Sequence, residues 1–316
     1  MKVLITGGSG FIGSHLVKKY EDLGSDVSVL DNVSTGNLAN LKGTSASVIK
    51  GDIRDRELVT SLMNDSDLVI HMAAALGVEN IMSNTIEAIS TNVLGSQVVL
   101  EAAAELNKRI LIASTSEIYG KNPNQPLSEE DDRVVGSPQN FRWSYSDAKA
   151  IEEAIAKSLQ ISKGLKVTTV RFFNTVGPGQ TGQYGMVLPR FVESALAGKE
   201  IRVFGDGNQT RVFCHVDDAV EAVVGLLNSD LSIGEVFNVG GVGEISINQL
   251  AAKVIELTNS NSKVEHIPYK MALPEGYEDM QRRVPNTSKI KNVIGWQPKN
   301  DINQIIMDVA NHMGQK

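Results

Sequence analysis

Short apolar runs alternate with amphipathic stretches along the first half of the chain. The apolar runs have the length of buried strands, and the stretches between them repeat apolar residues at helical spacing. The longest amphipathic stretch, residues 86–106, carries apolar residues such as Ile89, Val93 and Ala102 on one face and predicts a single long helix. Strands are predicted at residues 2–6, 26–31, 47–50, 67–71 and 109–113. This alternation predicts an α/β fold with a doubly wound parallel sheet.

The second half continues the alternation with shorter elements. Strands are predicted at residues 165–173, 201–204, 209–213 and 235–239, and helices begin near Val187, His215 and Ser246. A chain of 316 residues is long for one hydrophobic core. One large domain with an appended lobe, or two domains, is therefore expected.

Composition and charge narrow the classes of partner. The chain is 41% hydrophobic and 21% charged, and 30 Lys and Arg against 37 Asp and Glu give a net charge of −7. An acidic balance of this kind argues against a surface for nucleic acid or anionic membranes. No apolar run is long enough to span a membrane, and residues 2–6 form a core strand instead of a signal peptide, so we expect a cytoplasmic protein. The single cysteine, Cys214, has apolar neighbours and is expected to be a buried structural thiol.

A glycine-rich turn follows the first strand directly. Gly7, Gly10 and Gly13 are spaced three apart between the strand at residues 2–6 and the helical pattern that begins near His15. Glycines in such a turn let backbone amides approach a pyrophosphate at a helix N-terminus, where the helix dipole favours anions. Taken alone, the spacing is equally compatible with an ordinary tight turn.

The end of the second strand favours the dinucleotide interpretation. Asp31 stands where such folds present a carboxylate to the adenosine ribose hydroxyls, and its charge would repel a 2′-phosphate. NAD is therefore favoured over NADP, although Asp31 and Asn32 would also suit the opening of a turn. Asp52, after the third strand, is expected either to contact adenine or to cap a helix that begins near Arg54.

Candidate chemistry follows the fifth strand. The segment 114–120 is rich in hydroxyl groups and contains Thr115 and Glu117 at the carboxyl edge of the sheet, the edge that also carries the glycine turn. Tyr145 and Lys149 lie four residues apart and share a helix face. An ammonium group, together with the positive charge of oxidised nicotinamide, would lower the phenol pKa and let tyrosinate act as a general base. His71, at the end of the fourth strand, is expected to be structural.

Together, the glycine spacing, Asp31, Thr115 and the Tyr145-x-x-x-Lys149 pair resemble the extended short-chain dehydrogenase/reductase family, and in particular its nucleotide-sugar epimerases, dehydratases and decarboxylases. The resemblance implies that Tyr145 takes a proton from the sugar C4 hydroxyl while C4 loses hydride to NAD, that Thr115 binds the reacting oxygen, and that Lys149 holds the nicotinamide ribose. No metal is implied. The implied NAD contacts are Gly7, Gly10, Phe11, Ile12, Gly13, Asp31, Asn32, Asp52, Ile53, Ala73, Ala74, Asn92, Tyr145 and Lys149. The implied nucleotide-sugar contacts are Ser116, Asn174, Val187, Arg190, Phe204, Arg211 and Arg283.

The resemblance also implies an organisation for the chain. Residues 1–174 would form the NAD-binding Rossmann domain with the catalytic residues, and residues 175–316 mainly a smaller C-terminal α/β lobe for the nucleotide sugar. Segments at about 212–240 would return to the main sheet. In this family two long helices, here residues 86–106 and 144–159, pair across a two-fold axis, which implies a homodimer.

Three reactions of a 4-keto sugar remain open. Re-reduction gives a 4-epimerase, elimination of water a 4,6-dehydratase, and loss of carbon dioxide a decarboxylase. The segment Thr115-Ser116-Glu117 resembles both GDP-mannose dehydratases and UDP-glucuronate decarboxylases, whereas Ser116 departs from the Asp-Glu pair of dTDP-glucose dehydratases. Arg283 before Val-Pro matches the decarboxylases, whereas the segment 75–79 lacks their Pro-Pro-His-Tyr run and leaves a UDP-sugar 4-epimerase open. A dinucleotide-binding sensor or scaffold without catalysis is the alternative from another class.

Overall fold

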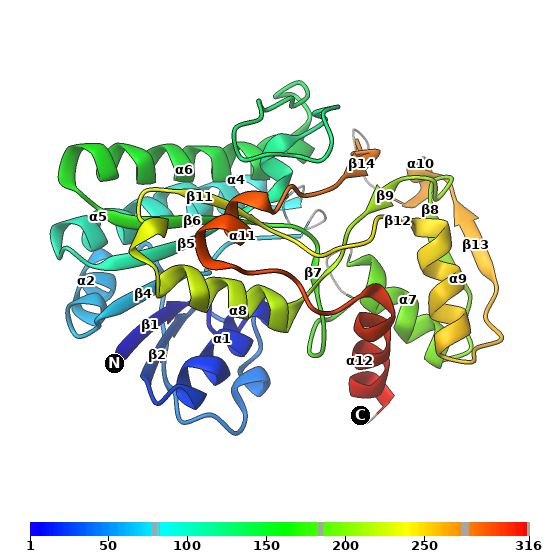
Figure 1. Ribbon diagram of the computed structural model, residues 1–316, viewed down its shortest axis with the longest axis horizontal. Coiled ribbons are helices and arrows are strands. Elements are labelled where there is room, and N and C mark those ends of the chain that lie inside the picture. The colour runs from blue at the N-terminus through cyan, green and yellow to red at the C-terminus, as the bar shows by residue number, and fades with distance from the viewer. Residues whose placement is uncertain (78–80, 82, 183–185, 273–277, 315–316) are drawn as a thin grey trace.

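A seven-stranded parallel sheet forms the centre of the larger lobe. The computed structural model describes residues 1–77, 81, 83–182, 186–272 and 278–314. The sheet has the order β11-β6-β5-β4-β1-β2-β3, and every neighbouring pair is parallel (Figure 1). The strands are β1 (Lys2–Thr6), β2 (Asp26–Asp31), β3 (Ser47–Lys50), β4 (Leu68–His71), β5 (Arg109–Thr115), β6 (Lys166–Phe172) and β11 (Val236–Val239). The predicted α/β class and parallel sheet are confirmed.

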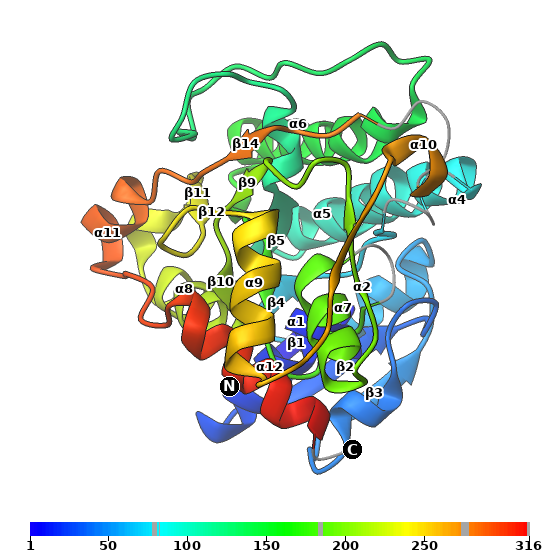
Figure 2. The ribbon, with the colours of Figure 1, turned by 90° about the vertical axis from the view of Figure 1, so that its right-hand side faces the viewer.

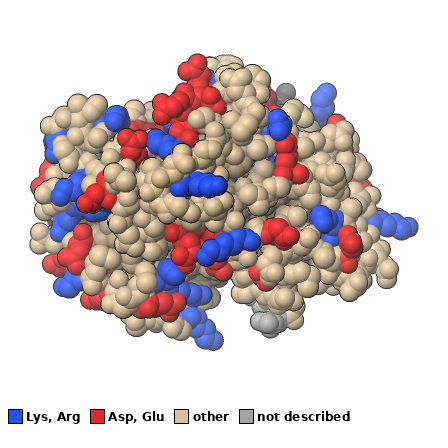
Figure 3. Space-filling view, in the orientation of Figure 1, with Lys and Arg blue, Asp and Glu red and all other residues tan. Residues whose placement is uncertain are grey.

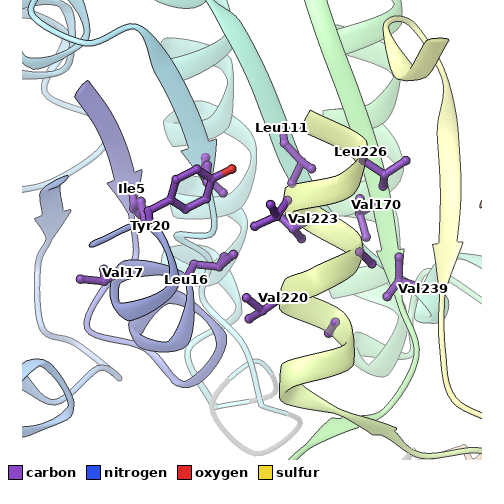
Figure 4. Packing of buried hydrophobic residues seen from close by; sticks show 14 of the residues in the cluster. Ile5, Leu16, Val17, Tyr20, Leu111, Val170, Val220, Val223, Leu226 and Val239 are labelled. Atoms are coloured by element: carbon purple, nitrogen blue, oxygen red, sulfur yellow. The ribbon is translucent and has the colours of Figure 1, made fainter. Parts of the chain in front are cut away.

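Helices cover both faces of this sheet. On one face, apolar residues of β1 such as Ile5 pack with α1 (Phe11–Asp22), α8 (Val216–Leu227) and α11 (Ser288–Ile294), as Figure 4 shows for the first two helices. On the other face, Leu4 belongs to the cluster that includes α2 (Arg56–Asn64), α5 (Ser96–Glu105) and α6 (Ser144–Lys163). Because successive residues of a strand point to opposite faces, a sheet covered on both sides needs strands that are apolar throughout.

The long helix predicted at residues 86–106 is interrupted in its middle. It consists of α4 (Thr85–Ile89), a π-helical turn (Ser90–Gly95) and α5. A π turn widens the helix locally and is often found at functional sites. Here it contains Asn92, a buried residue that was predicted to contact the cofactor.

The smaller lobe is built from the C-terminal part of the chain and has its own apolar core. This core joins α7 (Val187–Leu196), α9 (Ile247–Leu257) and α12 (Ile302–Gly314) with β8 (Ile201–Phe204), which pairs with β13 (Val264–Ile267) (Figure 2). The predicted strand at residues 209–213 is shorter than expected. Only Thr210–Arg211 forms β9, between β12 (Ile245–Ser246) and β14 (Arg282–Arg283). Other elements in the described part of the chain are β7 (Thr175–Val176), β10 (Cys214–His215), α10 (Tyr269–Ala272) and the short 3-10 helices Leu38–Leu41 and Asp230–Ser232.

The expectations for single buried residues are also met. Cys214 is fully buried, and burial raises the pKa of its thiol. Among the described residues, no helix has the length and apolarity needed to cross a membrane. Acidic and basic side chains are interspersed on the face drawn in Figure 3.

Candidate active site

A cleft opens where the strand order reverses. The chain passes from β1 outward to β2 and β3 and then returns to β4 on the other side of β1, so that the turns after β1 and β4 diverge at the carboxyl edge of the sheet. Ligands of open α/β sheets bind at such a switch point. The cleft is lined by Gly7, Gly10, Leu30, Asp31, Asn32, Ser34, Thr35, Gly36, Gly51, Ile53, Met72, Ala73, Ala74, Leu76 and Thr91.

The glycine turn needs its glycines for close approach. Gly7 has φ +71°, and a Cβ there would come within 2.6 Å of the Ala73 nitrogen. A Cβ on Gly13 would come within 2.2 Å of the Gly7 carbonyl oxygen. Gly10 is the N-cap residue of α1 and has no side chain to bond the first helical N–H groups. These N–H groups are suited to a phosphate, since the first four amides of a helix lack intrahelical partners.

Asp31, the last residue of β2, holds the glycine turn in place. Its carboxylate accepts hydrogen bonds from the Ser9 amide at 2.9 Å and the Val33 amide at 2.8 Å, and the residue is buried. Each oxygen has a second lone pair that remains suited to a ribose hydroxyl. Asp31 therefore both fixes the turn and presents negative charge to the cleft.

Four other residues predicted near the cofactor have local partners. Asp52 does not cap a helix, because α2 begins two residues after Arg54 and Asp55 is its N-cap. Asp52 instead binds Arg54 at 2.7 Å. The Asn92 side chain accepts from the Ala75 amide at 2.8 Å and donates to the Ala75 carbonyl at 2.9 Å, so it holds the loop after β4. Phe11 and Ile12 pack from the start of α1 against the core.

Part of the segment 75–79, which distinguishes the possible reactions, lies outside the described residues. Val78 and Glu79 belong to that part.

The end of β5 carries an ionised carboxylate held between two arginines. Thr115 accepts a hydrogen bond from the Glu117 amide at 3.1 Å and so begins the short helix Ser116–Tyr119, in which Ser116 is buried. Glu117 receives Arg283 Nη1 on Oε1 at 2.6 Å and pairs through Oε2 with Arg142 Nη2. We call Glu117, Arg142 and Arg283 the carboxylate clamp.

The clamp fixes the protonation state of Glu117. Burial opposes ionisation, but the charges and hydrogen bonds of Arg142 and Arg283 outweigh it and lower the pKa of Glu117 from 4.5 to about 2. The Glu117 side chain is 17% exposed and the arginine side chains 5% and 10%. Two guanidinium groups therefore share one carboxylate in a largely buried site.

Tyr145 and Lys149 lie on α6 as predicted, but the expected lowering of the Tyr145 pKa is not produced by the protein alone. Burial raises this pKa, the charges of Glu117 and Glu152 raise it further, and only a hydrogen bond with Thr115 favours the tyrosinate. The Lys149 ammonium donates to Glu152 Oε2 at 2.7 Å and to the Ala113 carbonyl at 2.8 Å. Its charge is therefore offset by a neighbouring carboxylate.

His71 is structural, as expected. Its ring contacts the Thr6 hydroxyl at 2.7 Å and the Ser96 hydroxyl at 3.0 Å, and it is fully buried. Burial, and secondarily the charge of Lys149, lower its pKa to about 3, so that the ring is neutral.

Among the residues expected to contact a nucleotide sugar, Asn174 contacts the clamp directly, whereas the side chains of Arg211 and Arg190 contact residues outside it. Asn174 lies beside the clamp, because its Oδ1 accepts from Arg283 Nη2 at 2.6 Å. Arg211 is the register partner of Arg283 in the neighbouring strand, but its side chain pairs with Asp279 at 2.7 Å. Arg190 covers the ring of Phe204 at 4.0 Å from its centroid. Val187 is the first residue of α7.

Sequence reasoning missed Arg142 and Glu152. Arg142 lies three residues before Tyr145 in a short helix (Phe141–Trp143), and no local pattern relates it to Glu117. For Glu152 a signal was present, since it follows Lys149 at i,i+3 on the same helix face.

The cleft suits NAD. It combines a turn that only glycines can form, unpaired helical N–H groups for a pyrophosphate, and a buried carboxylate for ribose. In the described part of the chain, no cluster of three or more His, Cys, Asp or Glu side chains is arranged to hold a metal ion.

Comparison with known proteins gives consistent matches. The family model described as "NAD dependent epimerase/dehydratase family" matches residues 3–240. A UDP-N-acetyl-alpha-D-glucosaminuronate decarboxylase of Bacillus cytotoxicus is 40% identical over 300 residues, which cover 94% of this chain and 92% of that protein.

Two solved structures resemble nearly the whole fold. UDP-glucose 4-epimerase of Thermotoga maritima with UDP-glucose has a TM-score of 0.90 and 30% identity, and covers 100% of this chain and 99% of its own. UDP-glucuronic acid 4-epimerase of Bacillus cereus, in complex with UDP-glucuronic acid and NAD, has a TM-score of 0.88 and 25% identity with the same coverage.

Proposed function

Because this chain belongs to the NAD dependent epimerase/dehydratase family and is an NAD-dependent enzyme that modifies nucleotide sugars, we propose that it decarboxylates a UDP-sugar whose C5 carries a carboxylate. UDP-glucuronate and its 2-N-acetyl counterpart are the substrates of this class. The 40% identical decarboxylase acts on the second of these by its name.

The observation that carries the proposal is the carboxylate clamp. Arg142 and Arg283 are both buried and converge on one carboxylate, that of Glu117, directly after β5 and beside Thr115. The same guanidinium groups could also hold a substrate carboxylate. Guanidinium groups suit this task, because their planar N–H groups match carboxylate oxygens.

The residues around the clamp supply the steps of the reaction. The cleft would hold NAD beside Gly7, Gly10 and Asp31, and bound NAD would supply the hydride acceptor and donor for the sugar C4. Tyr145 takes the proton of the C4 hydroxyl, and Thr115 holds the same oxygen. The resulting 4-keto group receives the electron pair of the C5–carboxylate bond as carbon dioxide leaves. Arg142 and Arg283 stabilise the enolate, a proton from solvent water is delivered to C5 on the side of Arg283, and Tyr145 returns its proton to the C4 oxygen.

The protonation state of Glu117 separates decarboxylation from dehydration. A dehydratase needs a base that removes the C5 proton. A carboxylate with a pKa of about 2 and two guanidinium partners is a weak base. Decarboxylation requires no such base, so the clamp favours it.

The test is incubation of the purified protein with UDP-glucuronate, UDP-N-acetylglucosaminuronate, UDP-glucose, UDP-N-acetylglucosamine and GDP-mannose, followed by mass spectrometry and sugar NMR. We expect loss of carbon dioxide from at least one uronate. Tyr145→Phe should retain NAD and lose turnover by roughly a hundredfold or more. Unchanged mass of both uronates, or loss of water from a neutral sugar, would overturn the assignment.

A UDP-uronate 4-epimerase is the second candidate. The structural likeness to a 4-epimerase with bound UDP-glucuronic acid favours it. In this case the clamp would bind the substrate carboxylate without cleaving it. The same incubation distinguishes the two reactions, because epimerisation changes the NMR spectrum of the sugar and leaves its mass unchanged.

We also propose the residue roles and the division of the chain that follow from this function. Residues 1–174 bind NAD and carry the catalytic residues Thr115, Glu117, Tyr145 and Lys149. Residues 175–316 mainly bind the nucleotide sugar. Their exceptions are β11, which lies in the main sheet, and α8 and α11, which pack against it.

A homodimer is proposed on the surface of α5 and α6. A shallow apolar groove there is lined by Glu101, Ile151, Ala154, Ile155, Ser158 and Leu159. Ile151 is 46% exposed and Ile161 76%. Light scattering should give twice the mass of one chain, and Ile151→Glu should shift the protein toward one chain.

A cytoplasmic location is inferred from the single buried thiol, since disulfide-stabilised proteins are typical of oxidising compartments. Fractionation of the source cells would test it.

A further inference from the structure

A second buried carboxyl group, that of Glu152, contacts the ammonium of Lys149. Glu152 is 0% exposed and Lys149 1% exposed, and Glu152 Oε2 lies 2.7 Å from Lys149 Nζ. The ammonium also donates to the Ala113 carbonyl at 2.8 Å. Since an ammonium has three donors, these two bonds leave one N–H direction for a ligand.

Glu152 stands at the end of a buried polar column. The Ser96 hydroxyl interacts with its carboxyl group, and Ser96 contacts His71 Nε2 at 3.0 Å. His71 Nδ1 contacts the Thr6 hydroxyl at 2.7 Å. This column connects the strand that leads into the glycine turn with the lysine of α6. A buried polar network of this kind fixes the positions of its members when each is bonded.

The next acidic residue on α6 is engaged elsewhere. Glu153 pairs with Arg171 at 2.7 Å and accepts from the Ser114 hydroxyl at 2.5 Å. Glu152 is thus the carboxyl group of α6 that meets Lys149. Burial raises the pKa of Glu152, and the Lys149 ammonium at 2.7 Å acts in the opposite direction and favours its charged form.

The charges around Tyr145 come from several elements. Glu117 follows β5, Arg142 precedes α6, Arg283 belongs to β14, and Lys149 and Glu152 lie on α6 itself. Within the clamp, Glu117 is already paired with both arginines. His71, from β4, is neutral because burial lowers its pKa to about 3. The pair of Lys149 and Glu152 is therefore the group on the tyrosine's own helix that can tune its ionisation.

We propose that Glu152 is a positioning residue. Its carboxyl group fixes the Lys149 ammonium and, by offsetting the charge of that ammonium, keeps Tyr145 protonated until oxidised cofactor is bound. The inference rests on the proposed function in one respect, because it takes Tyr145 as the catalytic base. It adds a residue that the Tyr145-x-x-x-Lys149 pattern does not contain.

The direct test is a pH titration of tyrosinate ultraviolet absorbance in the NAD-loaded protein, with Tyr145→Phe subtracted to isolate Tyr145. Glu152→Gln retains the size and hydrogen bonding of the side chain and removes the charge. We expect the Tyr145 titration to move to lower pH by roughly half to one unit, because a nearby negative charge disfavours tyrosinate. The acid limb of the kcat/KM profile with the uronate substrate should move in the same direction.

Asp147→Asn is the matched control. Asp147 lies on α6 two residues from Tyr145, but its side chain is 43% exposed and pairs with Arg133. Removal of its charge should leave the titration of Tyr145 unchanged, since solvent screens it. An equal shift in both variants would mean that any charge on α6 acts alike and would overturn the specific role of Glu152.

Other outcomes separate the inference from the proposed function. An unshifted Tyr145 titration in folded Glu152→Gln would overturn the inference. If Glu152→Gln does not fold, Glu152→Asp moves the charge away from Lys149 by one methylene. The Tyr145 titration should then shift by less, in the same direction. An unshifted titration again counts against the inference. The absorbance titration needs no sugar. If Glu152→Gln shifts the Tyr145 titration but no uronate is decarboxylated, only the proposed reaction is refuted. Full activity of Tyr145→Phe would refute Tyr145 as the base, on which the proposed function and the inference both depend.

Discussion

Glu117→Gln should destabilise the protein in a way that depends on pH. In the folded state the carboxylate clamp lowers the pKa of Glu117 from 4.5 to about 2. Each unit of such a shift corresponds to about 1.4 kcal/mol, so the clamp contributes about 3 kcal/mol to the free energy of unfolding. This agrees with the roughly 3–5 kcal/mol lost when one partner of a buried ion pair is removed.

The sign of the pH dependence follows from the direction of the shift. A carboxyl group whose pKa is lowered by folding contributes its full stability above its unfolded pKa, near 4.5, and loses it as the pH falls toward 2. The difference in unfolding free energy between wild type and Glu117→Gln should therefore be constant near neutrality. Below about pH 4.5 it should shrink by about 1.4 kcal/mol per unit.

Urea unfolding at a series of pH values between about 7 and 3 measures this difference. Glu105→Gln is the control, because Glu105 forms an exposed ion pair with Arg56 at 2.7 Å, and such pairs contribute about 0–1 kcal/mol. A Glu117→Gln protein as stable as wild type at neutral pH would refute the reasoning. So would a stability difference that does not change with pH.

Three further predictions concern the cofactor cleft and its support. Gly13→Ala places a Cβ 2.2 Å from the Gly7 carbonyl oxygen, so NAD affinity measured by calorimetry should fall by roughly tenfold or more; wild-type affinity would contradict the packing of the turn. Asp31→Asn keeps acceptor oxygen near the turn but removes the charge that repels a 2′-phosphate, so the ratio of NADP to NAD affinity should rise by roughly tenfold, and an unchanged ratio would count against this role of Asp31. Thr6→Val leaves buried His71 Nδ1 without its 2.7 Å partner and should cost about 1–3 kcal/mol in urea unfolding, whereas a neutral result would mean that the ring finds another partner.

The fold could be predicted because its signals are local. Each strand of the main sheet is a short apolar run between turn residues, and Gly7 stands directly after the first of them. The Tyr145 and Lys149 pair could be found for the same reason, since four residues on a helix fix a common face. The π-helical turn at Ser90–Gly95 was not predicted, because apolar periodicity continues through it and does not report a change in helical hydrogen bonding.

The environment of these local motifs could not be predicted in the same way. The sequence spacing of Tyr145 and Lys149 suggested that an ammonium would lower the phenol pKa. Glu152, one turn along the helix, takes up that ammonium at 2.7 Å, and burial of the phenol acts in the opposite direction. The motif thus points to the proposed base, whereas the protonation of Tyr145 depends on side chains that the motif does not include.

The choice among reactions depends on contacts between residues that lie still farther apart in the sequence. Glu117 alone is compatible with a dehydratase base, a decarboxylase or an unusual epimerase. Arg283 reaches it across 166 residues of sequence, and Arg142 reaches it from the other side of the excursion between β5 and α6. No periodic pattern in the sequence signals either contact. Together, the two arginines make Glu117 a weakly basic anion, which is poorly suited to remove a C5 proton. Two buried guanidinium groups that meet at one carboxylate beside Thr115 support the proposal of a substrate that brings its own carboxylate, because planar N–H groups match carboxylate oxygens.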